Sequence, residues 1–333
     1  MDLSAIEKAR GDIAAKHGEW TDHNIELAPG YFTIDESVTN VKLRRVLQIV
    51  SDMAREPLDR LRILDLACLE GQFAVEFARH GAKAVAIEGR EANLAKTRLA
   101  KDALDLDNLD LHLDNVLNLS EAKYGKFDVV LCLGILYHIN APDVFKFIER
   151  IGEVTTRFAV FDTYLGLGNV KPFQYGGHDY AGRVVREHTD QESEEARLQD
   201  RWSSIENNDS VWITKSSLIN ILLRSGFTSV YECHAPVELD KPMDRITYVA
   251  VKGETRQIKS IPRMNREPAV FLPENFRPPE SHQNRYESFS SRAVRIFPPG
   301  LRRFVKAKLR AVGIISRPME PWEWEQPWKK RDK

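Results

Sequence analysis

The chain has 333 residues, enough for one large domain, and its 48 Lys and Arg nearly cancel its 49 Asp and Glu. This balance excludes a general positive field for polyanions, so nucleic acid binding stays open only through a local basic patch and is not favoured. The three cysteines form no CxxC pair, which argues against a disulfide framework and a structural zinc site. The sequence shows no signal-peptide core and no apolar run of about 20 residues, so we expect a cytoplasmic protein without a membrane span.

The N-terminal flank, residues 1–56, is predicted to be helical and to include a lid. A charged helical start is followed by an aromatic segment from Trp20 to Phe32 and by another helix from about Val41. Within the aromatic segment, Tyr31 either folds over a bound ligand or packs in the core, and both interpretations stay open.

Residues 57–253 alternate short apolar runs with amphipathic stretches. The predicted strands are Leu61–Leu66, Ala84–Glu88, Leu109–Leu113, Phe127–Cys132 and Phe158–Asp162. The predicted helices between them are Phe73–His80 and Glu91–Leu104. Such alternation is typical of an α/β, doubly wound, mostly parallel sheet that binds ligands at the carboxyl ends of its strands.

After the fifth strand the pattern changes. Residues 165–210 form a long insertion rich in Gly, Tyr, His and charge, and loops of this length are more often functional lids than plain connectors. A helix over Thr214–Ser225, with Thr214 as its cap, is followed by strand-like runs at Ser229–Cys233 and Arg245–Val251. These additions predict a seven-stranded sheet with a terminal antiparallel strand.

The C-terminal extension, residues 254–333, is rich in Pro and Arg. It contains a predicted basic amphipathic helix over Leu301–Val312, for which a solvated surface is favoured over a membrane or polyanion contact. The terminal Trp322, Trp324 and Trp328 are expected to pack on the body or on a partner subunit, so a homodimer stays open.

The strongest motif is the turn after the first strand, Asp65-Leu66-Ala67-Cys68-Leu69-Glu70-Gly71. It resembles the first motif of class I (Rossmann-like) S-adenosylmethionine-dependent methyltransferases, with Ala67 and Leu69 where glycines are usual. Backbone must approach the ligand closely here, so Ala67 is a mild change, whereas Leu69 obstructs the ligand unless its side chain turns away. A nicotinamide dinucleotide is disfavoured, because its pyrophosphate needs the second glycine.

Later segments extend this resemblance in the right order. Glu88 ends the second strand, where a fixed carboxylate can accept hydrogen bonds from both ribose hydroxyls; an exposed helix-capping role is the alternative. The segment 113–116 matches the place of an adenine-binding Asp, and 127–134 resembles the fourth motif. The resemblance implies S-adenosyl-L-methionine as cofactor. The residues expected to bind it are Asp65, Ala67, Cys68, Gly71, Phe73, Glu88, Gly89, Arg90, Asp114, Asn115, Val116, Leu133 and Gly134.

The run Gly134-Ile135-Leu136-Tyr137-His138 narrows the resemblance further. It is similar to a segment of the methyltransferases related to the tRNA wobble-uridine carboxymethyltransferase, a broad group whose members also act on small molecules or glycans. Methyl transfer to oxygen or nitrogen needs alignment and a base, and His138 suits a base; a packing role is equally open. Tyr137 and Asp162 are the other catalytic candidates.

The acceptor is predicted to be held by polar side chains of the insertion and its neighbours. These candidates are Tyr31, Tyr164, His178, Tyr180, Arg183 and His188. No metal is expected, because the His and Asp separations match no tight ligand motif.

The function predicted is in-line methyl transfer to O or N of a polar small-molecule or glycan-type acceptor. One alternative is a tRNA- or RNA-modifying (carboxy)methyltransferase, which would need cationic and phenolic groups around the extra carboxylate of its donor. Another is a non-catalytic, cofactor-binding scaffold.

Overall fold

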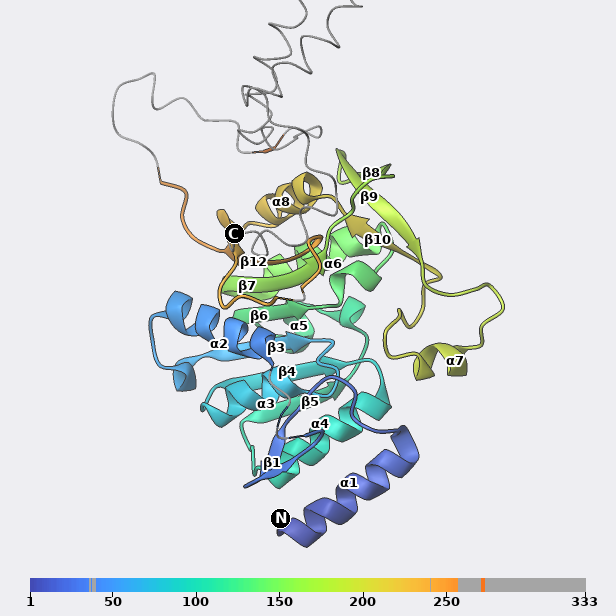
Figure 1. The fold of residues 1–333 in the computed structure, drawn as a ribbon. Coiled ribbons are helices and arrows are strands. Elements are labelled where there is room, and N and C mark those ends of the chain that lie inside the picture. Colours follow the sequence, from blue (N-terminus) through green and yellow to red (C-terminus); the bar gives the residue numbers. More distant parts are fainter. Residues whose placement is uncertain (36, 38–39, 240, 257–270, 273–333) are drawn as a thin grey trace, which may run out of the picture. The chain divides into compact units, whose positions relative to one another are not determined.

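The computed structural model describes residues 1–35, 37, 40–239, 241–256 and 271–272 (Figure 1). The chain divides into two compact units, residues 1–274 and 275–333, and the second lies outside the described residues. The predicted basic helix over 301–312 and the three terminal tryptophans therefore also lie outside them. Among the described residues, none of the helices combines the length and the apolar character that crossing a membrane requires.

A seven-stranded sheet forms the centre of the first unit. Its strands lie in the order β11 (Ser229–Cys233), β12 (Arg245–Val251), β7 (Thr155–Tyr164), β6 (Phe127–Leu133), β3 (Arg62–Leu66), β4 (Lys83–Glu88) and β5 (Leu109–Leu113). The strands from β5 to β7 are parallel, whereas β12 runs antiparallel to both β7 and β11. This arrangement confirms the predicted fold class.

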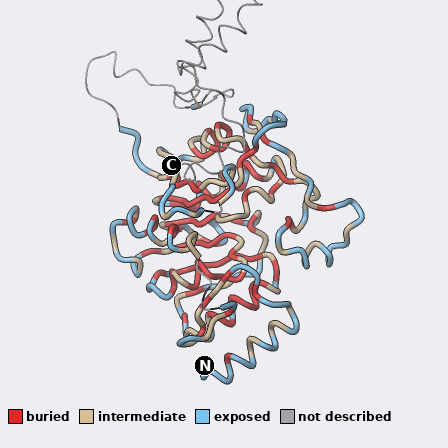
Figure 2. Tube along the Cα trace, in the orientation of Figure 1, coloured by how far each residue is buried: buried red, intermediate tan, exposed pale blue. Residues whose placement is uncertain are grey.

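Helices cover both faces of the sheet because successive strand residues point to opposite sides. Leu64 of β3 lies in the core cluster that includes α6 (Asp143–Val154) and α8 (Lys215–Arg224). Its neighbour Ile63 lies in the cluster that includes α2 (Val41–Ala54) and α3 (Gln72–Arg79). Figure 2 shows the sheet as the most completely buried part of the unit. The strand ends are thus fixed from both sides.

Shorter elements complete these layers. On the α3 side, α4 (Glu91–Ala103) packs against α1 (Leu3–His17), whose Ile6 is buried, and against the small pair β1 (Glu26–Ala28) and β2 (Tyr31–Phe32). The remaining short helices are α5 (Glu121–Tyr124) and three 3₁₀ turns, η1 (Leu58–Arg60), η2 (Val116–Asn118) and η3 (Leu136–His138). The N-terminal flank is therefore packed onto the sheet domain, and the proposed boundary near residue 56 remains a prediction.

The insertion is more regular than a loop. It contains the hairpin β8 (Lys171–Tyr175) and β9 (His178–Arg186), the helix α7 (Glu194–Gln199), and β10 (Asp209–Ile213), which pairs with β9. Gly176 and Gly177 form the hairpin turn with φ of +58° and +76°, a conformation that favours glycine in tight hairpins. Charged residues scattered along β9 hid its strand character. Because β10 runs from residue 209 to 213, the regular structure passes the predicted end of the insertion at 210.

Candidate active site

A cavity of about 650 Å³ opens at the carboxyl ends of β3, β4, β6 and β7. Its volume lies within the range of small-molecule sites, and its position is the one expected for a parallel sheet. The predicted residues that line it are Asp65, Ala67, Cys68, Phe73, Glu88, Gly89, Arg90, Asn115, Val116, Leu133, Gly134, Tyr137, His138 and Tyr164. The structure therefore brings together most of the predicted cofactor residues and two catalytic candidates.

The turn after β3 takes glycine-like backbone conformations without glycine. Ala67 and Leu69 each have φ of +52°, which costs an L-residue about 1–2 kcal/mol. The turn is held by neighbouring strands: Cys68 N donates to Ile87 O at 3.1 Å, and Leu69 N donates to Glu88 Oε2 at 2.9 Å. The Leu69 side chain forms part of the cavity wall instead of turning away. The departure from glycine thus leaves the shape of the turn intact.

Gly71 has a different role from the one predicted. Its φ is +83°, and a Cβ at this position would lie 2.2 Å from Thr97 Cγ2 of α4. It does not line the cavity, so it serves the close approach of α3 and α4 that shapes the turn.

Glu88 is buried at the end of β4, unlike an exposed helix-capping residue. Its two oxygens accept backbone N–H groups, one from Leu69 and one from Arg90, each at 2.9 Å. Burial raises its pKa. On the same wall, Asn93 Oδ1 is buried and has no hydrogen-bond partner among the described residues. Since each carboxylate oxygen can accept more than one hydrogen bond, Glu88 and Asn93 suit the hydroxyl or amino groups of a bound nucleoside.

The N-terminal flank reaches the cavity, but through Asp22, His23 and Lys42 and not through the predicted Tyr31. Glu70 accepts the backbone N–H groups of Thr21 and His23 at 3.0 and 3.1 Å and pairs with the buried Lys96 at 2.8 Å. His23 lines the cavity, and its Nδ1 accepts from Gln72 N at 3.1 Å. Burial lowers the pKa of His23 to about 4, so this ring is neutral at neutral pH.

Asp65 connects the cavity wall to α3. Its Oδ2 accepts from Ala74 N at 3.2 Å, and burial raises the pKa of Asp65 to about 7. The Asp65 carboxyl therefore changes its charge near neutral pH, on a wall that a ligand would contact.

His138 contacts a carboxylate from the insertion. Its Nδ1 lies 3.0 Å from both carboxylate oxygens of Glu187, whose side chain is only 8% exposed. Burial acts to raise the pKa of Glu187, but the contact with His138 and the backbone N–H of Ser204 outweigh it and hold this pKa below the ordinary value. No described residue hydrogen-bonds to His138 Nε2, so this nitrogen is free for a ligand.

Aromatic rings form the wall beside His138. Tyr164 stacks on Trp212 with centroids 4.7 Å apart, and the Tyr137 ring lies edge-on to Tyr164 at 4.9 Å. The Arg245 guanidinium lies 5.3 Å from the Tyr164 ring. Burial raises the pKa of Tyr137 to about 12, so its phenol stays protonated at neutral pH. This part of the cavity combines aromatic rings with cationic side chains.

Part of the chain matches a known protein family by sequence. Residues 63–157 match the family described as "Methyltransferase domain". This part of the chain is a methyltransferase domain. The match confirms the predicted class and, with it, S-adenosylmethionine as the cofactor.

Curated relatives cover the domain but not the whole chain. The ubiquinone biosynthesis O-methyltransferase of Acinetobacter baumannii (strain AYE) is 28% identical over 142 residues, covering 43% of this chain and 54% of that protein. The magnesium-protoporphyrin O-methyltransferase of Rhodobacter capsulatus is 27% identical over 139 residues, covering 39% and 59%. The chain therefore spans about half the length of these relatives.

A solved structure extends the likeness beyond the matched segment. The N-terminal domain of EvdMO1, solved in the presence of S-adenosylhomocysteine and D-fucose, has a TM-score of 0.58 and 21% sequence identity. The similarity covers 76% of this chain and 98% of that domain. It supports the fold of the methyltransferase domain together with its additions.

Asp162 lies behind the cavity of the methyltransferase domain and does not line it. Its carboxylate accepts from Arg245 Nε at 2.7 Å, Lys241 Nζ at 2.6 Å and Thr247 Oγ1 at 2.7 Å, and Lys42 Nζ lies 3.5 Å away. Burial opposes ionisation, but these cations hold the pKa of Asp162 well below its usual range. The structure corrects the catalytic assignment: Asp162 is a counter-ion that fixes Lys42 and Arg245, both of which line the cavity.

Asp114 is also corrected. Its carboxylate accepts from Tyr124 Oη and Asn118 Nδ2 and pairs with Lys123. Burial opposes ionisation of the Asp114 carboxyl, but these donors lower its pKa to about 2. Asp114 does not line the cavity, whereas Asn115, Val116 and Leu117 after it do.

Five predicted acceptor-binding residues lie outside the cavity wall: Tyr31, His178, Tyr180, Arg183 and His188. Tyr31 packs against the core cluster beneath α1, and Tyr180 is buried in a stack on Phe145. His178 is exposed beside the hairpin turn, and the Arg183 guanidinium lies over Trp212. His188 uses both ring nitrogens on Glu192 and Ser204 O. Tyr180 and Arg183 point to opposite faces of β9, a strand that sequence patterns did not predict.

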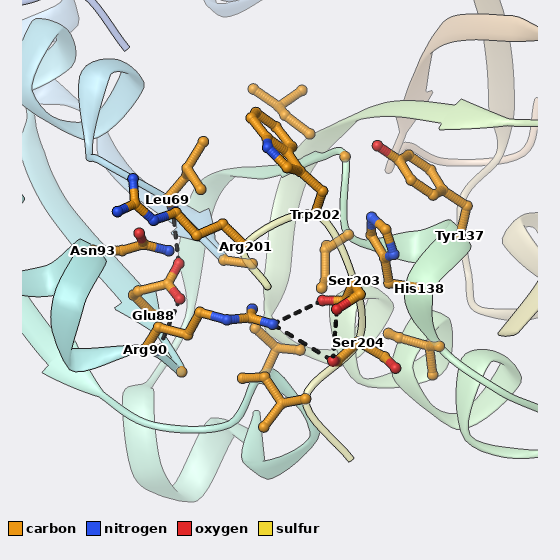
Figure 3. Close-up of a pocket in the computed structure, with 18 of the residues that line it drawn as sticks. Leu69, Glu88, Arg90, Asn93, Tyr137, His138, Arg201, Trp202, Ser203 and Ser204 are labelled. Atoms are coloured by element: carbon orange, nitrogen blue, oxygen red, sulfur yellow. Dashed lines mark hydrogen bonds between the residues drawn. The ribbon is translucent and has the colours of Figure 1, made fainter. Parts of the chain in front are cut away.

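The segment 197–207 of the insertion borders the cavity opposite the sheet. Arg90, after β4, donates to the carbonyl oxygens of Asp200 at 2.7 Å and Ser203 at 2.9 Å. Arg201 donates to Glu19 O and His17 O of the N-terminal flank. Figure 3 shows Glu88 and Asn93 on one side, Tyr137 and His138 on the other, and residues 202–204 between them. Two arginines thus fix this segment, and its role as a lid remains a prediction.

Proposed function

We propose that the chain transfers the methyl group of S-adenosylmethionine to a hydroxyl of a small polar acceptor, with a sugar as the favoured class. The observation that carries the proposal is His138, paired with Glu187, on the wall of the same cavity as Glu88 and the β3 turn. The curated relatives are O-methyltransferases by name, and the EvdMO1 domain was solved with D-fucose present. These likenesses support oxygen as the acceptor atom.

The chain's own groups account for the chemistry required. When bound, S-adenosylmethionine supplies a methyl group on a positively charged sulfur, and displacement leaves S-adenosylhomocysteine. Glu88 and Asn93 hold the ribose end, which fixes the direction of the sulfur. The oxygen of the acceptor hydroxyl forms a bond to the methyl carbon while the carbon–sulfur bond breaks. His138 Nε2 takes the proton of that hydroxyl in the same step. The proton then leaves from the imidazole to solvent.

The aromatic wall supports a sugar-type acceptor. Tyr164 and Trp212 line the cavity with aromatic carbon, which can contact the apolar face of a pyranose, while Tyr137 and Arg245 supply donors for its hydroxyls. Aromatic surface with donors around it is a combination that suits a sugar acceptor.

The proposal is tested by binding and product mass. S-adenosylhomocysteine is titrated calorimetrically into the full chain, which is then incubated with methyl-deuterated S-adenosylmethionine and a panel that includes D-fucose, other deoxysugars and their nucleotide esters. We expect binding and the gain of one labelled methyl group on a sugar hydroxyl. Failure to bind would overturn the proposal, and binding without transfer to any sugar or cell-extract component would favour the cofactor-binding scaffold.

A second candidate function concerns a donor that carries a carboxylate. Arg245 Nη2 and Tyr137 Oη both approach Gly134, where a Cβ added to that glycine would lie 3.7 and 3.6 Å from them. They supply the cationic and phenolic groups that a carboxymethyl donor requires. This alternative is the one associated with RNA modification. A titration that prefers carboxy-S-adenosylmethionine over S-adenosylmethionine, with transfer to tRNA, would favour it; the opposite preference would favour the first candidate.

A further inference from the structure

Two histidines in and beside the insertion face carboxylates, but in different settings. His188 is buried and places Nδ1 against Glu192 at 2.6 Å and Nε2 against Ser204 O at 2.8 Å. Both of its ring nitrogens are therefore used within the fold. His138 lines the cavity and places only Nδ1 against a carboxylate, that of Glu187. In the second setting one ring nitrogen, Nε2 of His138, is left for proton transfer.

A carboxylate beside Nδ1 determines which nitrogen carries the proton. An ionised carboxylate only accepts hydrogen bonds, so the adjacent Nδ1 must donate. In a neutral imidazole the other nitrogen, Nε2, is then the basic one. Glu187 has the charge this requires, because its carboxylate also accepts from Ser204 N and its pKa is lowered.

We propose that Glu187 is the positioning residue for His138: it keeps the ring proton on Nδ1 and leaves Nε2 as the base toward the acceptor. This inference rests on the proposed function, in which His138 takes the hydroxyl proton. Glu187 itself does not contact the acceptor in any step; it acts through the histidine.

The segment 197–207 completes this pair. Ser204 donates its N–H to Glu187, while Asn207 Nδ2 donates to His138 O at 3.1 Å. Arg90 holds the neighbouring Ser203 O. The same short segment thus positions both partners, and Arg90 connects it to the end of β4 where the cofactor-binding Glu88 lies.

The ring tautomer of His138 gives a test that needs no acceptor. The full chain is labelled with ¹⁵N-histidine and its ring nitrogens are assigned with a His138→Gln variant, in alkaline buffer, with and without S-adenosylhomocysteine. We expect the wild-type ring to carry its proton on Nδ1. Finding it on Nε2 in the wild-type chain overturns the proposal, whatever the variants do.

Variants distinguish a positioning role of Glu187 from a general loosening of the fold around it. In Glu187→Gln the amide oxygen is retained by Ser204 N, so the amide NH₂ faces Nδ1 and the ring proton should move to Nε2. Glu187→Asp keeps an acceptor-only group and should restore the wild-type tautomer. Glu192→Gln, the matched control, breaks the corresponding contact of His188 and should leave His138 unchanged. An unchanged tautomer in Glu187→Gln, or the same change in Glu192→Gln, overturns the proposal.

Turnover adds an independent readout. With a sugar found in the screen above, Glu187→Gln should lower kcat about 10²-fold while the Kd for S-adenosylhomocysteine stays within about twofold. Equal losses in both would overturn a positioning role. The tautomer is read without acceptor, so finding the ring proton on Nε2 overturns the role of Glu187 and leaves the proposed methyl transfer standing. Absence of cofactor binding overturns the proposed methyl transfer alone.

Discussion

The two sides of the cavity are built in different ways. The proposed cofactor side comes from residues close together in the sequence, such as Ala67 and Leu69 in the turn after β3 and Glu88 at the end of β4. The acceptor side combines His138 with Glu187, Trp212 and Arg245, which come from four distant segments. The first side is therefore determined by local backbone geometry and the second by how the insertion packs. A binding defect and a turnover defect should accordingly be separable.

The largest effect should follow His138→Ala, which would sharpen this separation. Turnover should fall about 10²–10⁴-fold, because the hydroxyl loses its base, while affinity for S-adenosylhomocysteine changes little. Steady-state kinetics and calorimetry measure the two quantities. His178→Ala, on the exposed hairpin, should behave like the wild type. A loss of affinity as large as the loss of turnover would show that the two sides are not separate.

Glu88→Ala should give the converse result. Affinity for S-adenosylhomocysteine should weaken by about 2–4 kcal/mol, because a buried charged acceptor is lost from both the ribose and the Leu69 N–H. The control is Glu91→Ala, which removes an exposed carboxylate three residues later, paired with Arg98. Unchanged affinity in calorimetry would refute the ribose assignment.

Gly71→Ala tests whether the cofactor side depends on backbone geometry. The new Cβ would meet Thr97 at a positive φ, so we expect a loss of about 2–3 kcal/mol in the free energy of unfolding, measured with urea. Gly30→Ala has a similar φ of +74° but no atom within 4 Å, and should lose only about 1 kcal/mol. Equal losses would mean that the approach of α4 is not limiting.

The smallest effect concerns Asp114, which the structure removes from the binding surface. Its pKa is lowered from 3.8 to about 2 in the folded chain, so its stabilising contribution is present above pH 3.8 and is lost as the pH falls through about 2. Because its partner Lys123 is solvent-exposed, we expect at most about 1 kcal/mol. Asp114→Asn should flatten the acid limb of the stability curve without weakening cofactor affinity; weaker affinity would return the residue to the site.

The same contrast explains what the sequence could predict. Apolar runs and the Asp65 to Gly71 motif predicted the sheet, the turn and the place of Glu88, because strand ends of a parallel sheet meet at one edge. The insertion has no such rule. His178 and Tyr180 differ by two positions on β9, yet one is exposed and the other is in the core. Both side chains lie on the same face of β9, but His178 is at the strand end beside the hairpin turn, whereas Tyr180 stacks on Phe145. The sequence could not show which part of the strand meets the core.

Of the site residues that the sequence did not predict, Asn93 alone could have been found from its spacing. Asn93 follows Glu88 by five residues, at the start of α4, where its side chain faces the cavity. Lys42 and Arg245 could be placed only after the structure showed β12 beside β7 and α2 over the sheet. Glu187 lies 49 residues from His138 and required the insertion to fold back.

Glu70 gives the first two dozen residues a consequence for anyone who shortens this protein. Its carboxylate is completely buried, and Thr21 and His23 supply much of its backbone coordination. Deleting them would leave Lys96 as the main remaining partner of Glu70 inside the protein, and Glu70 lies in the turn after β3 that we propose binds the cofactor. Removing the first two dozen residues, Thr21 and His23 included, should therefore damage ligand binding.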